Sequence, residues 1–479
     1  MSAGPSRRSR FLAWTPFAIV IAGSAALFGF DLGRRVLATN DEARFPVMAR
    51  DILANGHWLL PETSGGPMLN KPPLHAWLIA LAAWPIGGVS QRAAVVPSFL
   101  GALVVVMLTC WIARRLFEPG VALVAGVIVG TTAGMYALAR SPVPDMTLAC
   151  GIVAAMAAFV AAELHGQRGA WLGFYVLVGL ACWVKGPAGL LPLLVALVYE
   201  LTAFGWRGAR RMRAGVGVAI LVILIAPWWA LAANAGRAQF VDDVVRADMM
   251  HGYNPLRALA WHRIVEPLGA AATILFPWSV LLPFAVWWAA RRWKTAAAAG
   301  ERLALVWALV VFVVVAASSR QRWRYYLPLC VPGALLIAPW LLTRLGRRKT
   351  AATMVAGAVA AGILVVGGSY IADRDNRSTQ FPTIARALEG TPAPVFALDA
   401  PELVFSFYLE RPIRAISAPA ELRGLDPPLY VIARSAPADS FDPLAEGRVN
   451  RRSFVLWVKR SIRAASSGSR AAGASGRAR

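Results

Sequence analysis

The chain has 479 residues, of which 58% are hydrophobic and only 15% are charged. Soluble domains carry about a quarter charged residues, so this composition excludes an ordinary soluble protein. Apolar runs long enough to cross a bilayer recur along the chain and predict a polytopic membrane protein. The net charge of +24 does not indicate nucleic-acid binding, because the basic residues lie between apolar runs, as cytoplasmic loops and anionic headgroups require.

The N-terminal apolar run Phe11–Phe30 follows the basic segment Met1–Arg10. It is too long for a signal peptide and no small-residue cleavage site follows it, so we expect a retained first span with a cytoplasmic N-terminus. The cysteines all lie in apolar runs and are predicted to be free buried thiols. They are Cys110, Cys150, Cys182 and Cys330.

The apolar runs predict a helix bundle over residues 1–371 with about 11–13 spans. The expected crossings are 11–31, 93–113, 120–139, 146–164, 169–184, 187–204, 214–233, 266–290, 302–318, 325–343 and 350–371. Leu74–Gly88 is also apolar, but it is short and Pro85 interrupts it, so we expect a re-entrant or interfacial helix.

With the N-terminus inside, the inside loops hold most of the purely basic clusters, as the positive-inside rule requires. The loops on the other side mix acids with bases and hold most of the acids of the predicted bundle, which indicates a site on that face. These outer segments are 31–71, 139–145, 185–187, 234–266 and 318–326. The loop that contains the first of these segments, residues 31–72, is predicted to carry the catalytic motif.

After Ile371 the composition is no longer that of a membrane segment. Short β-like runs predict a small α/β domain over residues 372–460 on the outer, periplasmic face. The expected strands are 394–398, 413–416, 429–433 and 454–458, with a helix at 401–410. The Ser-, Gly-, Ala- and Arg-rich tail 461–479 is predicted to be disordered.

Asp41 and Glu42 follow the first span, where Thr39 or Asn40 could cap a short helix. The pair is typical of a capped surface helix, and equally of a carboxylate that deprotonates an acceptor hydroxyl. Lys71 precedes two prolines and is either an interfacial lysine or a cation held against a phosphate.

Arg140 and Asp145 stand at the two ends of a proline-stiffened turn between two spans. They are either an ion pair that anchors the turn or functional groups at membrane depth. Lys185, before Gly186 and Pro187, belongs either to a reversing turn or to a phosphate contact. A basic and aromatic segment on the same face is either an interfacial belt or a site for a lipid phosphate. It contains Arg320, Arg322, Arg324, Tyr325 and Tyr326.

Together, and in this order, these motifs resemble those of the GT-C membrane glycosyltransferases, specifically the lipid A aminoarabinose transferases and the related protein mannosyltransferase-like enzymes. The resemblance covers residues 11–345. The motifs that carry it are DEARFPVMARDILANGHWLLP, KPPLHAWLIAL, ARSPVPDM, VKGP, LFPWSVLLP and RYYLPLCVP. It implies a sugar donor carried on undecaprenyl or a similar polyprenyl phosphate, and transfer on the periplasmic side to a lipid-borne or protein acceptor.

The resemblance also implies roles for individual residues. Asp41 corresponds to the key acid or base, Glu42 and Arg44 complete its motif, and Asp145 corresponds to the acid of the second outer loop. The predicted donor-phosphate contacts are Arg44, Lys71, Lys185, Arg320, Arg322, Arg324, Tyr325 and Tyr326.

The sequence departs from the aminoarabinose enzymes at Asn70, where they have a glutamate that helps to hold a metal ion. An amide is a poorer ligand, so both a divalent metal cofactor and aminoarabinose as the sugar are left open. In the loop 234–266 the family offers a histidine, for which Asp243, Arg246 and His262 are the candidate positions.

The sequence thus predicts a glycosyltransferase of the bacterial inner membrane that uses a polyprenyl-phosphate sugar, with inversion. The competing class is a transporter or flippase of a lipid-linked sugar, which typically has polar residues through the bilayer midplane. A non-enzymatic subunit of an envelope complex is the third. No phosphate-cradling Gly-rich loop, Gly-x-Ser-x-Gly motif or Walker lysine motif is present. The sequence does not identify the sugar, the acceptor or the oligomeric state.

Overall fold

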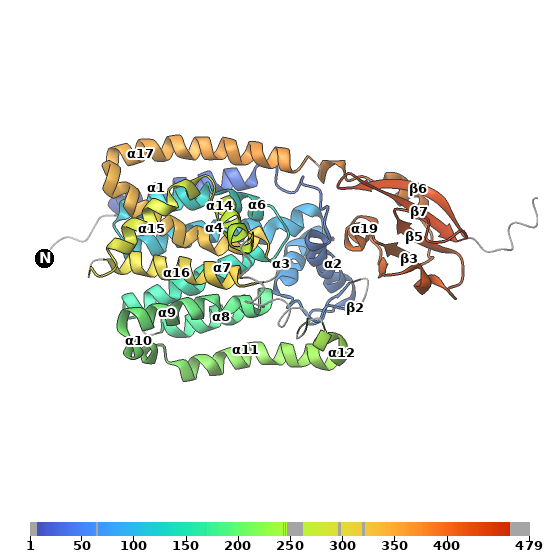
Figure 1. Ribbon diagram of the computed structural model, residues 1–479, viewed down its shortest axis with the longest axis horizontal. Helices are drawn as coiled ribbons and strands as arrows, with labels where there is room; N and C mark the ends of the chain where they lie inside the picture. The colour runs from blue at the N-terminus through green and yellow to red at the C-terminus, as the bar shows by residue number, and fades with distance from the viewer. Residues whose placement is uncertain are drawn as a thin grey trace, which may run out of the picture.

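A computed structural model describes residues 7–63, 66–167, 169–242, 244, 246, 262–295, 298–318, 321–374 and 376–459. Figure 1 shows a bundle of helices joined to a C-terminal sheet domain, with α2 (Asn40–Asn55) and α3 (Leu74–Ala83) between the two. The other helices of the bundle are α1 (Arg7–Gly29), α4 (Gln91–Leu116), α5 (Pro119–Gly130), α6 (Ala133–Ala139), α7 (Asp145–Phe159), α8 (Ala170–Lys185), α9 (Leu191–Phe204), α10 (Trp206–Arg211), α11 (Ala214–Ala235), α12 (Arg237–Phe240), α14 (His262–Leu275), α15 (Leu282–Arg291), α16 (Ala299–Ala316) and α17 (Cys330–Ala372).

The bundle is that of a multi-pass membrane protein. Among the described residues, six helical segments are long and apolar enough to cross a membrane, or up to seven if the pair α5 and α6, bent by 58°, forms one span. Two of the six, Ala170–Phe204 and Trp323–Ser378, each cover two of the crossings expected from sequence. The α3 segment is too short to cross, as the proline after it led us to expect.

Breaks in the long segments occur where the backbone needs glycine or proline. Gly186 separates α8 from the 3-10 helix Gly186–Leu190 and adopts φ +58°, a conformation that other residues rarely take. Gly346 (φ 70°, ψ 165°) interrupts α17 and separates the two crossings expected at 325–343 and 350–371. The single span expected over 266–290 is divided into α14 and α15, because Pro277 has no N–H to continue the helix.

The C-terminal domain is built on a five-stranded sheet with strand order β4-β3-β5-β7-β6. Strand β3 (Val395–Leu398) pairs in parallel with β4 (Arg414–Ile416) and β5 (Leu429–Ala433), while β7 (Arg452–Lys459) is antiparallel to β5 and β6 (Phe441–Val449). Helices α18 (Pro382–Leu388) and α19 (Glu402–Leu409) complete the domain. A separate small hairpin, β1 (Glu62–Thr63) and β2 (Gly66–Pro67), follows α2.

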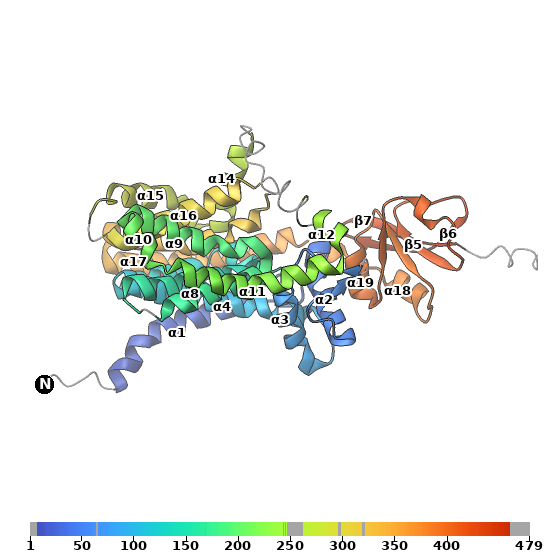
Figure 2. The same cartoon turned by 90° about the horizontal axis from the view of Figure 1, so that it is seen from below.

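The C-terminal domain packs directly on α2 through a shared hydrophobic core. Phe45 and Met48 of α2 belong to the same buried cluster as Val404 and Phe405 of α19. Arg50 of α2 donates hydrogen bonds to the carbonyl oxygens of Ser406 and Phe407 at 3.0 and 2.7 Å. Figure 2, turned by 90°, also shows α2 beside α19. The domain is therefore attached to the helix that carries Asp41.

The cysteines are free, and all but Cys150 are buried, which confirms free thiols within the bundle.

Candidate active site

A cavity of about 720 Å³ opens where α2, the beginning of α7, the end of α8 and the 3-10 helix Trp323–Leu329 meet. This volume lies within the ~300–1,000 Å³ of typical small-molecule sites. Polar and charged residues line one part of the cavity. They are Asp41, Arg44, Asn70, Lys71, Asp145, Lys185, Ser318, Gln321, Arg322, Arg324 and Tyr325.

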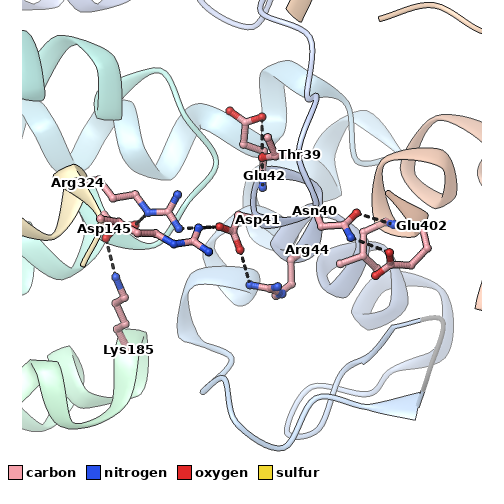
Figure 3. A network of polar contacts seen from close by, with 11 residues as sticks. Thr39, Asn40, Asp41, Glu42, Arg44, Asp145, Lys185, Arg324 and Glu402 are labelled. Carbon is pink, nitrogen blue, oxygen red and sulfur yellow. Dashed lines mark hydrogen bonds and ion pairs between the residues drawn. The ribbon is translucent and has the colours of Figure 1, made fainter. Parts of the chain in front are cut away.

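Asp41 reaches the cavity from the first turn of α2. Thr39 is the N-cap of this helix, and its hydroxyl accepts the backbone N–H of Glu42 at 3.3 Å, as the sequence predicted. The Asp41 carboxylate contacts three arginines: Arg44 at 3.0 Å, Arg324 at 2.9 Å, and Arg322. Figure 3 shows Asp41 between Arg44 and Arg324. The three guanidinium groups compensate the carboxylate charge.

Asp145 is the first residue of α7, where the helix dipole favours a negative charge, and it is 4% exposed. Its Oδ1 lies 2.6 Å from Nζ of Lys185, the last residue of α8. Its Oδ2 lies 3.2 Å from Nε of Arg324. The ends of two helices that are neighbours in the bundle therefore place a buried acid against a lysine.

Arg324 connects the two acids, because its Nη2 bonds to Asp41 and its Nε faces Asp145. The second contact lacks hydrogen-bond geometry, and both of its atoms are buried without a hydrogen-bond partner among the described residues. Lys185 also lies over the ring of Tyr325, with Nζ 3.9 Å from the ring centroid. The cluster thus retains hydrogen-bonding capacity for a ligand.

The rest of the cavity wall is apolar. It includes Leu148, Val184, Leu190, Leu191, Leu194, Trp229, Val314 and Val315. A surface with several lysine and arginine side chains and an apolar surface therefore share one cavity, which suits a ligand with a phosphate and an isoprenoid or acyl chain.

Several residues predicted for the site lie elsewhere. Glu42 faces away from Asp41, because successive helix residues are rotated by about 100°, and it pairs with Arg35. Tyr326 is fully buried, and its hydroxyl donates to Gln321 at 3.2 Å. Arg140 lies outside the cavity, as described below. Arg246 pairs with the exposed Asp242 at 2.6 Å.

Arg320, Asp243 and the side chain of His262 lie outside the described residues. Gln321 and Trp229 are among the cavity-lining residues that were not predicted for the site. Gln321 stands inside the basic and aromatic segment and could have been found there. Trp229 comes from α11, and no spacing in the sequence connects that helix to the acids.

The described cavity residues do not fit a divalent metal ion. Both carboxylates already contact lysine or arginine, and Asn70 offers only an amide oxygen. The part of the chain that the structure describes holds no group of three or more His, Cys, Asp or Glu residues that could bind a metal.

Comparison with solved structures identifies the fold. The ArnT structure from Cupriavidus metallidurans bound to undecaprenyl phosphate superposes with a TM-score of 0.77 at 19% identity, covering 92% of this chain and 98% of that one. The chain has the GT-C fold. The oligosaccharyltransferase of Archaeoglobus fulgidus, in its apo form, shares this GT-C architecture with a TM-score of 0.60 at 13% identity, covering 90% of this chain and 70% of that one.

Sequence comparison agrees with the GT-C assignment. Residues 70–230 match the family described as dolichyl-phosphate-mannose-protein mannosyltransferase. The undecaprenyl phosphate-alpha-4-amino-4-deoxy-L-arabinose arabinosyl transferase of Edwardsiella ictaluri is 27% identical over 64% of this chain and 56% of its own length. The enzyme of that name from Pseudomonas paraeruginosa is 28% identical over 69% of this chain and 60% of its own length. The chain thus matches less than two thirds of the length of these relatives.

Proposed function

We propose that this chain is a glycosyltransferase that moves a sugar from a polyprenyl-phosphate donor, of the undecaprenyl-phosphate type, to a lipid-borne, lipid A-like acceptor. The observation that carries the proposal is the convergence of Asp41, Asp145, Lys185 and Arg324 in one cavity with an apolar wall. The relatives named as arabinosyl transferases support it. So does the family match, whose description also names a polyprenyl-phosphate sugar.

The cations of the cavity suit the leaving group of such a donor. When the bond between the anomeric carbon and the phosphate oxygen breaks, negative charge grows on the phosphate. Preorganised cations aimed at that charge stabilise the transition state. Lys185 and Arg324 are the residues placed to do this. Lys71 would bind the donor phosphate before reaction, and the aliphatic wall formed by α7 and α9 would hold the first isoprene units.

Asp41 would act on the acceptor. For a hydroxyl acceptor it takes the proton as the oxygen attacks, after one or more of its arginines turns to the substrate. A phosphate acceptor is already ionised, so the arginines released from Asp41 would orient it instead. Attack opposite the departing phosphate gives inversion at the anomeric carbon. Asp145 holds Lys185 and Arg324 in position, and no step requires a metal ion.

We infer that the cavity and the C-terminal domain lie on the periplasmic face of the bacterial inner membrane, with the N-terminus in the cytoplasm. The distribution of basic loops supports this orientation, because Arg207–Arg213 and Arg344–Lys349 lie on the side opposite to Asp41 in the predicted topology. A polyprenyl-phosphate donor and a lipid acceptor would both reach the cavity from that leaflet.

The test is transfer by the purified full-length chain in detergent. Polyprenyl-phosphate sugars carrying a labelled pentose, hexose or amino sugar are incubated with lipid A, and the products are identified by mass spectrometry and the anomeric configuration by NMR. We expect a product of inverted configuration from the lipid-linked donor and none from a nucleotide sugar. Movement of intact donor across proteoliposomes without product would instead identify a flippase.

A further inference from the structure

A second, smaller cavity of about 40 Å³ lies where the chain leaves α1, at the end of α6 and at the end of α17. Arg140 reaches this cavity from the beginning of the turn that ends at Asp145, so the turn has one charged residue in each cavity. The charged residues lining it are Asp31, Arg34, Arg35, Arg140, Asp373 and Arg377.

The cavity has an excess of positive charge. It holds four arginines and two aspartates, and each aspartate already has an arginine partner. Asp373 accepts a hydrogen bond from Arg35 at 2.8 Å, and Asp31 lies 3.5 Å from Arg34. Among the described residues, Arg140 and Arg377 form no ion pair with a carboxylate.

Of these two arginines, Arg140 gives the stronger indication of an anion site, because it is only 6% exposed. Its guanidinium donates to the Tyr136 hydroxyl, lies 4.6 Å from the centroid of that ring, and reaches the Asp31 carbonyl oxygen at 3.4 Å. Its Nε has no hydrogen-bond partner in the described part of the chain. A buried charge without a counter-ion is costly, so an anion in this cavity would be favourable.

The cavity lies beside an exposed apolar surface of α17. Ile363 and Ile371 of α17 are 68% and 74% exposed, as expected for side chains in contact with acyl chains. Tyr370 is 64% exposed, and the Arg377 guanidinium lies over its ring at 3.7 Å. An arginine stacked on an aromatic ring is typical of the headgroup region of a bilayer.

We propose that this cavity binds the phosphate of an anionic phospholipid headgroup from the leaflet nearest the C-terminal domain. Its volume corresponds to roughly three water molecules, which suits a phosphate group and excludes a sugar. The lipid would be linked to the larger cavity in two ways. Arg140 shares a turn with Asp145, and Arg35 pairs with Glu42, the neighbour of Asp41. The binding itself does not depend on the transferase proposal.

The test compares lipid binding by the full-length chain and by two matched variants, using native mass spectrometry and thermal stabilisation. Arg377→Gln removes an exposed cavity arginine, and Arg374→Gln removes an exposed arginine three positions away that does not line the cavity. Arg140→Gln is the third variant. Each is titrated with phosphatidylglycerol, phosphatidylcholine and inorganic phosphate.

We expect wild type and Arg374→Gln to prefer phosphatidylglycerol to phosphatidylcholine, and Arg377→Gln to bind it about tenfold more weakly. If inorganic phosphate stabilises wild type but not Arg377→Gln, the phosphate site is supported, and its ligand is then free phosphate rather than a lipid headgroup. Equal binding of phosphatidylglycerol by wild type and Arg377→Gln, or equal weakening by both surface variants, would overturn the proposal. If Arg140→Gln fails to fold, Arg377→Gln still decides between these results.

Discussion

Nη2 of Arg324 lies 2.9 Å from Oδ2 of Asp41, although 283 positions separate the two residues in the chain. The same guanidinium faces Asp145 through its Nε at 3.2 Å. One planar side chain therefore joins the acid of α2 to the acid of α7. Arginine suits this role because its nitrogens form a fixed fork, whereas a lysine ammonium is a single point charge.

Replacing Arg324 with lysine should therefore lower transfer strongly, since a lysine can contact one acid but not hold both. We expect kcat/KM to fall by about 10²-fold, in line with the loss of one preorganised charge contact. Arg322→Lys is the comparison, because among the described residues the Arg322 side chain forms an ion pair with Asp41 but not with Asp145, and it is 49% exposed. A smaller effect at position 324 than at position 322 would contradict the bridging role.

Lys71 should act mainly in donor binding, because it lines the cavity close to Asn70 and belongs to the segment between α2 and α3. We expect Lys71→Gln to raise the KM for the polyprenyl-phosphate donor by about tenfold, the usual effect of losing a charge-assisted contact. Lys349→Gln, in α17 beyond the break at Gly346, is the control and should leave KM unchanged. An unchanged KM with a lower kcat in Lys71→Gln would assign Lys71 to the chemical step instead.

The C-terminal domain should hold Asp41 in position through Asn40, the residue that precedes Asp41 in the sequence. Asn40 Nδ2 donates to Glu402 at 2.7 Å, and its Oδ1 accepts the Leu403 N–H at 3.1 Å (Figure 3). Glu402→Ala removes the acceptor, so we expect faster hydrogen exchange over the first turn of α2 and severalfold lower transfer. Glu402→Gln keeps an oxygen acceptor and should restore both. Identical exchange in the two variants would show that the contact has no positioning effect.

His75 should make the protein acid-sensitive. It is fully buried, and burial lowers its pKa from 6.5 to about 4. At neutral pH the ring is therefore uncharged. Its Nε2 donates to the Pro142 carbonyl oxygen at 3.2 Å, which leaves Nδ1 to accept from the Thr147 hydroxyl at 2.9 Å.

Because the unfolded chain binds this proton more readily, the stability contributed by neutral His75 is complete above pH 6.5. It is lost as the pH falls towards 4, by up to ~3 kcal/mol. His75→Gln removes this titration, so the difference in Tm between wild type and variant should shrink between pH 7 and pH 4.5. A difference that stays constant over that range would show that His75 does not titrate in this way.

Much of the bundle and the acids of the site could be predicted from sequence, because span length and mixed-charge loops are local features. The convergence of Asp41 with Arg324 could not, since it depends on how distant helices pack. The edge strand β6 was missed because most of its side chains are exposed and it contains Pro443 and Gly447, which are uncommon in strands.

Glu42 and Arg140 show that even within a single motif the sequence does not predict which side chains reach the site. Both lie within three positions of residues that line the larger cavity, yet both point elsewhere, Glu42 to Arg35 and Arg140 to the smaller cavity. A motif identifies a segment, while the rotation of a helix or the path of a turn decides which of its side chains reach the ligand.

The most direct test of the account is sugar transfer by Asp41→Asn, measured beside Asp51→Asn, which removes the same charge from the same helix outside the cavity. We predict that Asp41→Asn remains folded but transfers at least ~10²-fold more slowly, as expected when an acid at the reacting atoms is lost, while Asp51→Asn keeps its activity. Transfer by Asp41→Asn at the rate of wild type would contradict the account.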